Sequence, residues 1–254
     1  MSTITERIKQ LNGETNAAEN GLFGETWSFR LNQAFDENEE SIALAHNKSF
    51  AVNTFTRFRR WETGLERQFR AVATSMKSRE FRNVDREVYY CVDGGYDMHH
   101  GDHLDNKLMY VSQALAQFKD ELKRQGIWEN VVIVSGSDFG RTLVPNSNGG
   151  TDHAWGGHYF MMGGSLNGGK ILGKYPEDIR EGAPYRIGRR GRVVPETSYT
   201  SMWNGIAQWM GVPEEELDDL LPNRKNFDKC VLQTDKDLFK DGSTDPYCPS
   251  NIFG

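Results

Sequence analysis

Apolar positions follow a helical period in two segments of this chain. Residues 61–80 carry apolar side chains every three or four positions, which predicts an amphipathic helix. Its stripe consists of Leu65, Phe69, Val72, Ala73 and Met76. A longer stripe before Gly126 predicts a second helix, because glycine commonly ends helices. Its members are Leu104, Leu108, Val111, Leu115, Phe118 and Leu122.

Two β-prone runs flank the longer helix. Residues 87–92 and 130–135 are largely apolar, and each run leads into glycine-containing polar residues, which predicts two buried strands. Strand, helix and strand in this order predict a right-handed βαβ unit with parallel strands. The loops after both strands would then lie at one carboxyl edge of the sheet, where open α/β sheets bind ligands.

The remaining chain shows shorter patterns. Residues 158–163 predict a further strand of the sheet, and residues 168–173 a short strand or hairpin arm. Residues 175–195 have a loop-like composition. Ser198 is predicted to cap a helix, and Pro213, followed by three glutamates, to start a short one.

Both ends of the chain are weakly patterned. Residues 1–60 are polar, which predicts short helices and loops with partial disorder at the start, and residues 228–254 form a tail without periodicity. We therefore expect an N-terminal extension over 1–60, an α/β domain over 61–227 and a C-terminal tail over 228–254.

Composition narrows the class of protein. The chain has 254 residues, 37% of them hydrophobic and 26% charged, which is typical of a soluble domain with extensions. A net charge of −6 without a long basic run argues against nucleic acid or an anionic membrane as partner. No stretch approaches the roughly 18 apolar residues of a membrane span. The first residues are polar and contain no secretory hydrophobic region, so localisation stays open.

Three cysteines are present, so at least one is unpaired. Cys91 lies in an apolar run, which predicts a buried thiol. Cys230 and Cys248 either pair in an oxidising compartment or stay free.

Histidines gather in two glycine-containing clusters. Five of the six lie within residues 94–103 and 149–158. Imidazole together with carboxylate suits Zn²⁺ or Mn²⁺, and glycine lets the backbone turn tightly enough to aim them. The first cluster offers Asp97 and His99 as candidate metal ligands. The second offers Asp152, His153 and His158.

Residues after the strand 130–135 add a carboxylate and a guanidinium. Asp138 is a candidate cation ligand, and Arg141 suits bidentate binding of a phosphate or sulfate oxygen. The alternative is a turn in which Asp138 caps local amides and Arg141 neutralises it. Residues 186–192 contain four arginines, which indicates either an anion-binding segment or a solvated loop.

Several strings occur together in the order found in one family. Residues 137–143, 150–158, 163–164 and 168–170 resemble the domain of unknown function 1501 family. Residues 95–99 resemble its Gly-aromatic-Asp-Thr-His segment, with Met98 in place of threonine. The resemblance extends over about residues 61–227.

That family looks like a distant branch of the alkaline phosphatase and sulfatase superfamily. The resemblance implies an α/β fold with a mostly parallel central sheet flanked by helices and metals at its carboxyl edge. It implies that Asp97 and His99 form one ligand segment. It also implies that Asp138 belongs to an Asp-His ligand pair and His153 is a later lone ligand.

Two features depart from the superfamily pattern. Phe139 stands where the superfamily has its second ligand histidine, which argues against a complete two-metal centre. Residues 1–60 contain neither the N-terminal strand nor the Ser or Thr nucleophile segment, so the chain resembles the C-terminal part of such proteins. Members are usually exported.

The favoured hypothesis is a metal-dependent hydrolase of a small phosphate or sulfate ester, with Zn, Mn, Mg or Ca as cofactor. Arg141 would be the catalytic residue that orients the anion. The candidate metal ligands are Asp97, His99, Asp138, Asp152, His153 and His158. One alternative is a non-catalytic binding or structural module with a degenerate metal site. Another is a fragment that works with a portion supplied by another chain. Substrate, metal identity and oligomeric state stay open.

Overall fold

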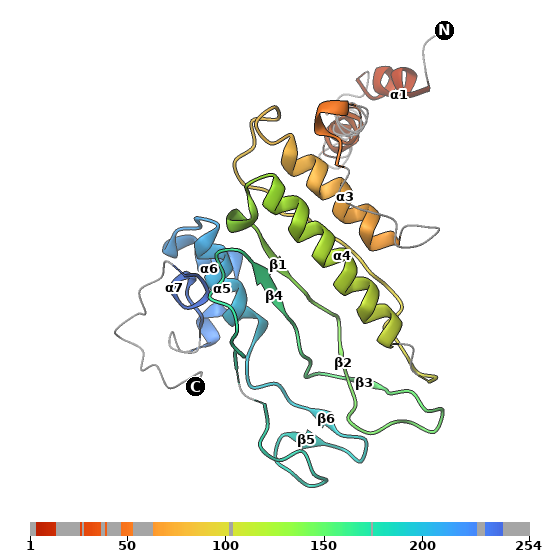
Figure 1. Ribbon diagram of the computed structural model, residues 1–254, viewed down its shortest axis with the longest axis vertical. Helices are drawn as coiled ribbons and strands as arrows, with labels where there is room; N and C mark the ends of the chain where they lie inside the picture. The colour runs from red at the N-terminus through yellow and green to blue at the C-terminus, as the bar shows by residue number, and fades with distance from the viewer. Residues whose placement is uncertain are drawn as a thin grey trace. The chain divides into compact units, whose positions relative to one another are not determined.

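The chain forms two compact units, Met1–Cys91 and Val92–Gly254, drawn as a ribbon in Figure 1. The structure is a computed structural model. It describes residues 4–13, 26, 28–36, 39, 47–52, 63–101, 104–173, 175–227 and 232–240. The boundaries expected at residues 60 and 227 stay predictions. The disorder expected at the start of the chain, the pairing of Cys230 with Cys248, and most of the C-terminal tail concern residues outside these ranges.

The described part of the first unit is mainly helical. It contains α1 (Ile4–Gly13), helical residues at 28–36, the short 3-10 helix η1 (Lys48–Phe50) and α3 (Gly64–Lys77). The helix predicted over 61–80 is confirmed as α3, which begins with a capping box. Thr63 Oγ1 accepts from Glu66 N at 3.2 Å, and Glu66 Oε2 accepts from Thr63 N at 2.7 Å.

The buried strand predicted over 87–92 is wrong. No strand among the described residues pairs with this run, and the side chains of Val88 and Tyr90 are 86% and 90% exposed. Side-chain bonds hold the run instead: Glu87 accepts from Arg82 at 2.5 Å and from the Tyr89 hydroxyl at 2.6 Å. Cys91 is a free thiol of intermediate burial rather than a buried one.

The second unit contains the long helix and the strand that the sequence predicts after it. The helix is α4 (Leu104–Arg124), and Gly126 follows it with φ +71°, a left-handed conformation that ends helices readily. The short 3-10 helix η2 (Trp128–Asn130) leads into β1 (Val132–Val134). The predicted strand at 158–163 is β4 (Met161–Gly163), which pairs antiparallel with β1 and places Ile133 opposite Met162.

The mostly parallel central sheet, and with it the alkaline-phosphatase-like fold class, is contradicted. In the described residues every sheet consists of two strands, and the two strands run antiparallel. The pairs are β1 with β4, β2 (Gly140–Arg141) with β3 (His153–Ala154), and β5 (Arg186–Ile187) with β6 (Arg192–Val193). The reason is that 87–92 forms no ladder, so the predicted βαβ unit lacks its first strand. Residues 168–173 also form no strand.

The core of the second unit lies where helices cover the β1–β4 pair. Helices α5 (Tyr199–Trp209) and α7 (Asp235–Leu238) pack together, and the rings of Trp209 and Phe239 stack at 4.9 Å. Ser198 caps α5, as predicted, by accepting from Thr200 N at 3.1 Å. The buried members of the cluster are Leu166, Ile206, Leu238 and Phe239, with Val132, Val134 and Met161 packed against them.

Short elements follow α5 as the sequence predicts. Pro213 precedes the 3-10 helix η3 (Glu214–Glu216), which continues into α6 (Leu217–Leu220) and then η4 (Arg224–Asn226). In Figure 1 the chain leaves β1 towards β2–β3 and β5–β6, away from α5, α6 and α7. None of the described helices combines the length and apolar character needed to cross a membrane.

Candidate metal centre

The two histidine clusters meet beside the β2–β3 pair. Arg141 lies opposite His153 in this ladder. The loop that carries Asp97 and His99 runs alongside, because Thr151 N donates to Met98 O at 3.0 Å and Asn146 Nδ2 donates to His99 O at 3.0 Å. The two histidine clusters, expected to meet at one edge of a parallel sheet, therefore lie side by side in the described residues 94–101 and 149–158, although the parallel sheet itself is absent from the described part of the chain.

A glycine allows this close approach. A Cβ on Gly150 would lie 2.3 Å from the carbonyl carbon of His99 and 2.5 Å from its oxygen. Such separations are far inside van der Waals contact, so a side chain at position 150 would push the two segments apart. The glycine-containing composition of the second cluster is thus a packing requirement of the site.

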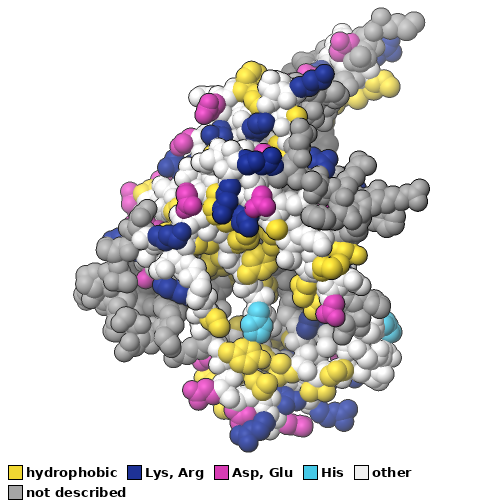
Figure 2. Space-filling model, viewed as in Figure 1, with side chains coloured by type: hydrophobic (Ala, Val, Ile, Leu, Met, Phe, Trp, Pro, Cys, Tyr) yellow, Lys and Arg dark blue, Asp and Glu magenta, His cyan; other side chains and the backbone are white. Residues whose placement is uncertain are grey.

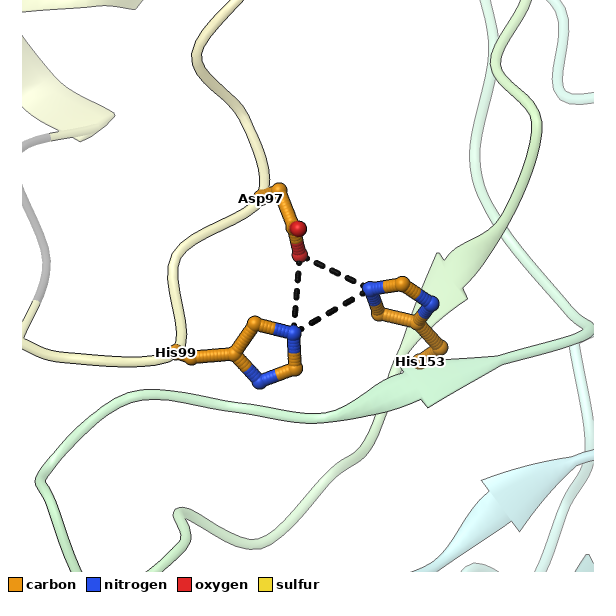
Figure 3. A group of neighbouring side chains, drawn as sticks. All are labelled: Asp97, His99 and His153. Atoms are coloured by element: carbon orange, nitrogen blue, oxygen red, sulfur yellow. Dashed lines mark hydrogen bonds and ion pairs between the residues drawn. The ribbon is translucent and has the colours of Figure 1, made fainter.

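Asp97, His99 and His153 form a triangle of potential metal ligands (Figure 3). Asp97 Oδ1 lies 2.8 Å from His153 Nε2 and 3.0 Å from His99 Nε2. The two Nε2 atoms lie 3.2 Å apart. Asp97 and His99 come from the loop and His153 from β3. Their side chains are 54%, 40% and 48% exposed, so a solute has access to all three.

Phe139 supports the His153 ring. The two rings stack with centroids 3.8 Å apart and an interplanar angle of 9°. The guanidinium carbon of Arg141 lies 5.6 Å from the centroid of the Phe139 ring. A phenylalanine cannot bind a metal, but a parallel stack restrains rotation of the imidazole. Phe139 therefore fixes the plane in which His153 Nε2 points at Asp97.

Asp152 contacts His99 from the far side of the imidazole. Its Oδ1 lies 3.4 Å from His99 Nδ1 and accepts from Asn146 Nδ2 at 3.0 Å, while Oδ2 accepts from Arg190. Hydrogen bonds from Asn146 and Arg190 lower the pKa of Asp152 to about 2, so it is a carboxylate at neutral pH. A carboxylate at Nδ1 favours the tautomer whose Nε2 lone pair faces Asp97 and His153.

Arg141 anchors Asp97. Its Nη1 donates to Asp97 Oδ1 at 2.9 Å, Nε donates to Thr151 Oγ1 at 2.9 Å, and Nη2 donates to Thr151 O at 2.6 Å. Hydrogen bonds with His153 and Arg141 hold the pKa of Asp97 below its usual value. With three donors engaged inside the protein, Arg141 is poorly placed for the bidentate anion binding expected of it.

Three of the six candidate ligands lie outside the triangle: Asp152, which contacts His99 as described above, Asp138 and His158. Asp138 is exposed and is not a member of the ligand group. His158 is also outside it, and its ring stacks on Tyr175 with centroids 5.3 Å apart. Asn146 was not predicted, and nothing in its sequence context singled it out. Arg190 lies in the basic segment, but its partner Asp152 became visible only in three dimensions.

The site brings one carboxylate and two imidazoles together in an arrangement that could hold a divalent metal, so the protein belongs to the class of candidate metal-binding proteins. Residues 26–184 match the family described as "Protein of unknown function (DUF1501)", and because this covers more than half of the chain, the chain belongs to that family. No curated protein and no solved structure matches the chain. Nothing in these comparisons connects it to the alkaline phosphatase and sulfatase superfamily.

Replacing Asp152 by asparagine tests whether the Asp152 carboxylate orients the His99 imidazole for metal binding. We expect the affinity for Zn²⁺ to fall by about 10- to 100-fold, because carboxylates that orient a ligating histidine typically contribute this much. Isothermal titration calorimetry measures the change. Asp178→Asn is the matched control, since Asp178 pairs with Arg180 and does not belong to the group of potential metal ligands. Equal Zn²⁺ affinity in Asp152→Asn and the control would show that Asp152 has no such role.

Proposed function

We propose that this protein binds a divalent transition metal through Asp97, His99 and His153 and hydrolyses a small phosphate or sulfate ester. One observation carries the proposal: an oxygen and two nitrogens from segments more than fifty residues apart lie 2.8–3.2 Å from one another. Hydrogen bonding alone does not require two Nε2 atoms to approach a single carboxylate oxygen so closely.

The spacing fits a metal. Bonds of about 2.1 Å place neighbouring ligands about 3.0 Å apart in octahedral geometry and about 3.4 Å apart in tetrahedral geometry. The observed separations of 2.8, 3.0 and 3.2 Å need only a few tenths of an ångström of adjustment. Two imidazoles favour Zn²⁺ over Mg²⁺ and Ca²⁺, which prefer oxygen ligands, and the Asp97 carboxylate together with open positions for water also suits Mn²⁺.

Each surrounding side chain supports one part of the chemistry. A bound cation would supply a Lewis acid that polarises an ester oxygen and lowers the pKa of a coordinated water. Asp152 keeps the His99 Nε2 lone pair on the side of the triangle, and Phe139 holds the His153 ring in its plane. Arg141 keeps Asp97 Oδ1 directed at both imidazoles. Three protein ligands leave coordination positions open for water and substrate, as catalytic sites require.

A second candidate function is a non-catalytic binding module. The observation in its favour is that Asp97 Oδ1 is shared among Arg141, His99 and His153, so this network has its partners without an ion. On this alternative the triangle is a structural cluster that links the loop to β3. Metal affinity and ester turnover separate the two functions.

The proposed function is tested with aryl esters. We expect protein loaded with Zn²⁺ or Mn²⁺ to hydrolyse 4-nitrophenyl phosphate or 4-nitrophenyl sulfate, because the metal stabilises the charge that develops on the ester oxygens. EDTA should abolish turnover, and added metal should restore it. Asp97→Ala should lose it, while Asp178→Ala retains it. Metal binding without turnover of either ester would favour the binding module instead.

A further inference from the structure

The β5–β6 hairpin contacts β3, the strand that carries His153, and it contains four arginines. We infer that Arg192, on β6, binds the anionic group of the substrate beside Asp97, His99 and His153. This inference rests on the proposed function and deepens it, since it assigns the anion-binding role to a residue other than Arg141. The hairpin also lies outside residues 26–184, the part of the chain that matches the family.

Backbone hydrogen bonds dock this hairpin onto the segments that build the site. Strand β6 and the turn before it accept from the chain that follows β2 and from the chain that follows β3. The bonds run from Leu143 N to Gly191 O at 3.0 Å, from Val144 N to Arg190 O at 3.0 Å, and from Gly156 N to Val193 O at 2.9 Å. Because both sides are bonded, the position of residue 192 relative to β3 is fixed by main chain rather than by mobile side chains.

Three of the four arginines of the hairpin donate to different partners. Arg186 donates to backbone carbonyls of Ile179 and Arg189, and Arg190 donates to Asp152. Arg192 donates through Nε to His153 O at 3.3 Å. Its two Nη groups bond to none of the described residues, and the side chain is exposed. Arg192 therefore combines contact with a ligand-bearing residue and free terminal donors.

The reach of Arg192 suits an anion held at the triangle. Its Nε lies 3.3 Å from the carbonyl oxygen of His153, and the covalent path from that oxygen to His153 Nε2 spans at most about 6 Å. Arg192 Nε and His153 Nε2 therefore lie at most about 9 Å apart, a gap that a metal-bound tetrahedral oxyanion and the Nη groups of Arg192 would span. A guanidinium with two free Nη groups matches the oxygens of phosphate or sulfate in a bidentate fashion.

The hairpin itself is basic, because residues 186–193 contain four arginines and no acidic residue. In Figure 2 the lower end of the view, where Figure 1 places β5 and β6, shows Lys and Arg side chains together with Asp and Glu side chains. Arg189 belongs to this surface but lies in the turn between the strands, and its side chain is exposed. It therefore offers a matched control that carries the same charge on the same hairpin.

Inorganic phosphate is the probe for this site. Calorimetry measures its dissociation constant for wild type, Arg192→Gln, Arg192→Lys and Arg189→Gln, each in metal-free and Mn²⁺-loaded form. We expect Arg192→Gln to weaken phosphate binding by about 10-fold or more, because a charge-assisted bidentate pair is lost. Arg192→Lys should recover part of the affinity, and Arg189→Gln should match wild type. Mn²⁺ affinity should change by less than about 3-fold in all three variants, since none removes a ligand.

The outcomes separate this inference from the proposed function. Equal phosphate affinity in Arg192→Gln and wild type overturns the inference, even where Mn²⁺ binds normally and the metal proposal stands. Failure of wild type to bind Mn²⁺ or Zn²⁺ overturns the proposed function. The metal-free titrations then decide the role of Arg192: a loss specific to Arg192→Gln supports it, and equal binding or no binding by wild type contradicts it.

Discussion

Replacing His153 by alanine is expected to lower the affinity of the protein for Zn²⁺ by more than about 100-fold, a larger loss than the 10- to 100-fold typical of groups that only orient a ligand. His153 Nε2 lies within 3.2 Å of both other ligand atoms, so its removal leaves a two-ligand site. Two protein ligands are too few for the closed or three-ligand sites in which zinc is normally held. Calorimetric titration of Zn²⁺ measures the loss directly.

His158→Ala is the matched control for this variant. His158 lies in the same glycine-rich stretch, but its ring stacks on Tyr175 and it is not a member of the ligand group. We expect its Zn²⁺ affinity to stay within about 3-fold of wild type, because no ligand is lost. An equal loss in both variants would show that the ligand set extends beyond the triangle. Unchanged affinity in His153→Ala would remove His153 from the site.

Replacing Gly150 by alanine is expected to disrupt the site without touching a ligand. The added Cβ would lie 2.3 Å from the His99 carbonyl carbon and 2.5 Å from Met98 O, both of them backbone atoms. Relief of this overlap has to move the loop that carries Asp97 and His99 away from β3. We expect a fall of about 1–3 kcal/mol in the free energy of unfolding, the usual range for overpacking. Zn²⁺ affinity should fall together with it, by at least about 10-fold.

Gly168→Ala provides the comparison for that substitution. A Cβ at Gly168 meets nothing within 4 Å, and its backbone is not in the left-handed region. Urea denaturation and Zn²⁺ titration of the two variants separate the local clash from the general effect of replacing glycine. Wild-type stability and affinity in Gly150→Ala would mean that the two histidine clusters do not approach as closely as the structure shows.

Local patterns are sufficient to predict the helices α3, α4 and α5 and the strands β1 and β4. The apolar stripes at Leu65–Phe69 and Leu104–Leu122 each lie along one face of a helix, so the sequence alone predicts α3 and α4. Ser198 was recognisable as a cap because capping depends on neighbouring residues. Strand 87–92 failed for the opposite reason. A β-prone run becomes a strand only when another segment offers hydrogen bonds, and that partner is not encoded locally.

The same distinction applies to the site. Asp97, His99 and His153 were identifiable because imidazole and carboxylate carry their chemistry with them. The direction of each side chain was not identifiable, so Asp138 and His158 were grouped with them as candidates. Arg141 illustrates the limit: its charge suited an anion, but three of its donors are taken by Asp97 and Thr151. These hydrogen-bond partners lie ten or more residues from Arg141 in the sequence, so only the tertiary structure brings them together.

A crystal soaked with Zn²⁺ or Mn²⁺ and measured at the absorption edge of the metal decides whether the triangle is a metal site. We predict one anomalous peak about 2.0–2.2 Å from Asp97 Oδ1, His99 Nε2 and His153 Nε2, with Asp152 still contacting His99 Nδ1. A peak coordinated by other side chains, or none at this position at millimolar metal, would contradict the assignment.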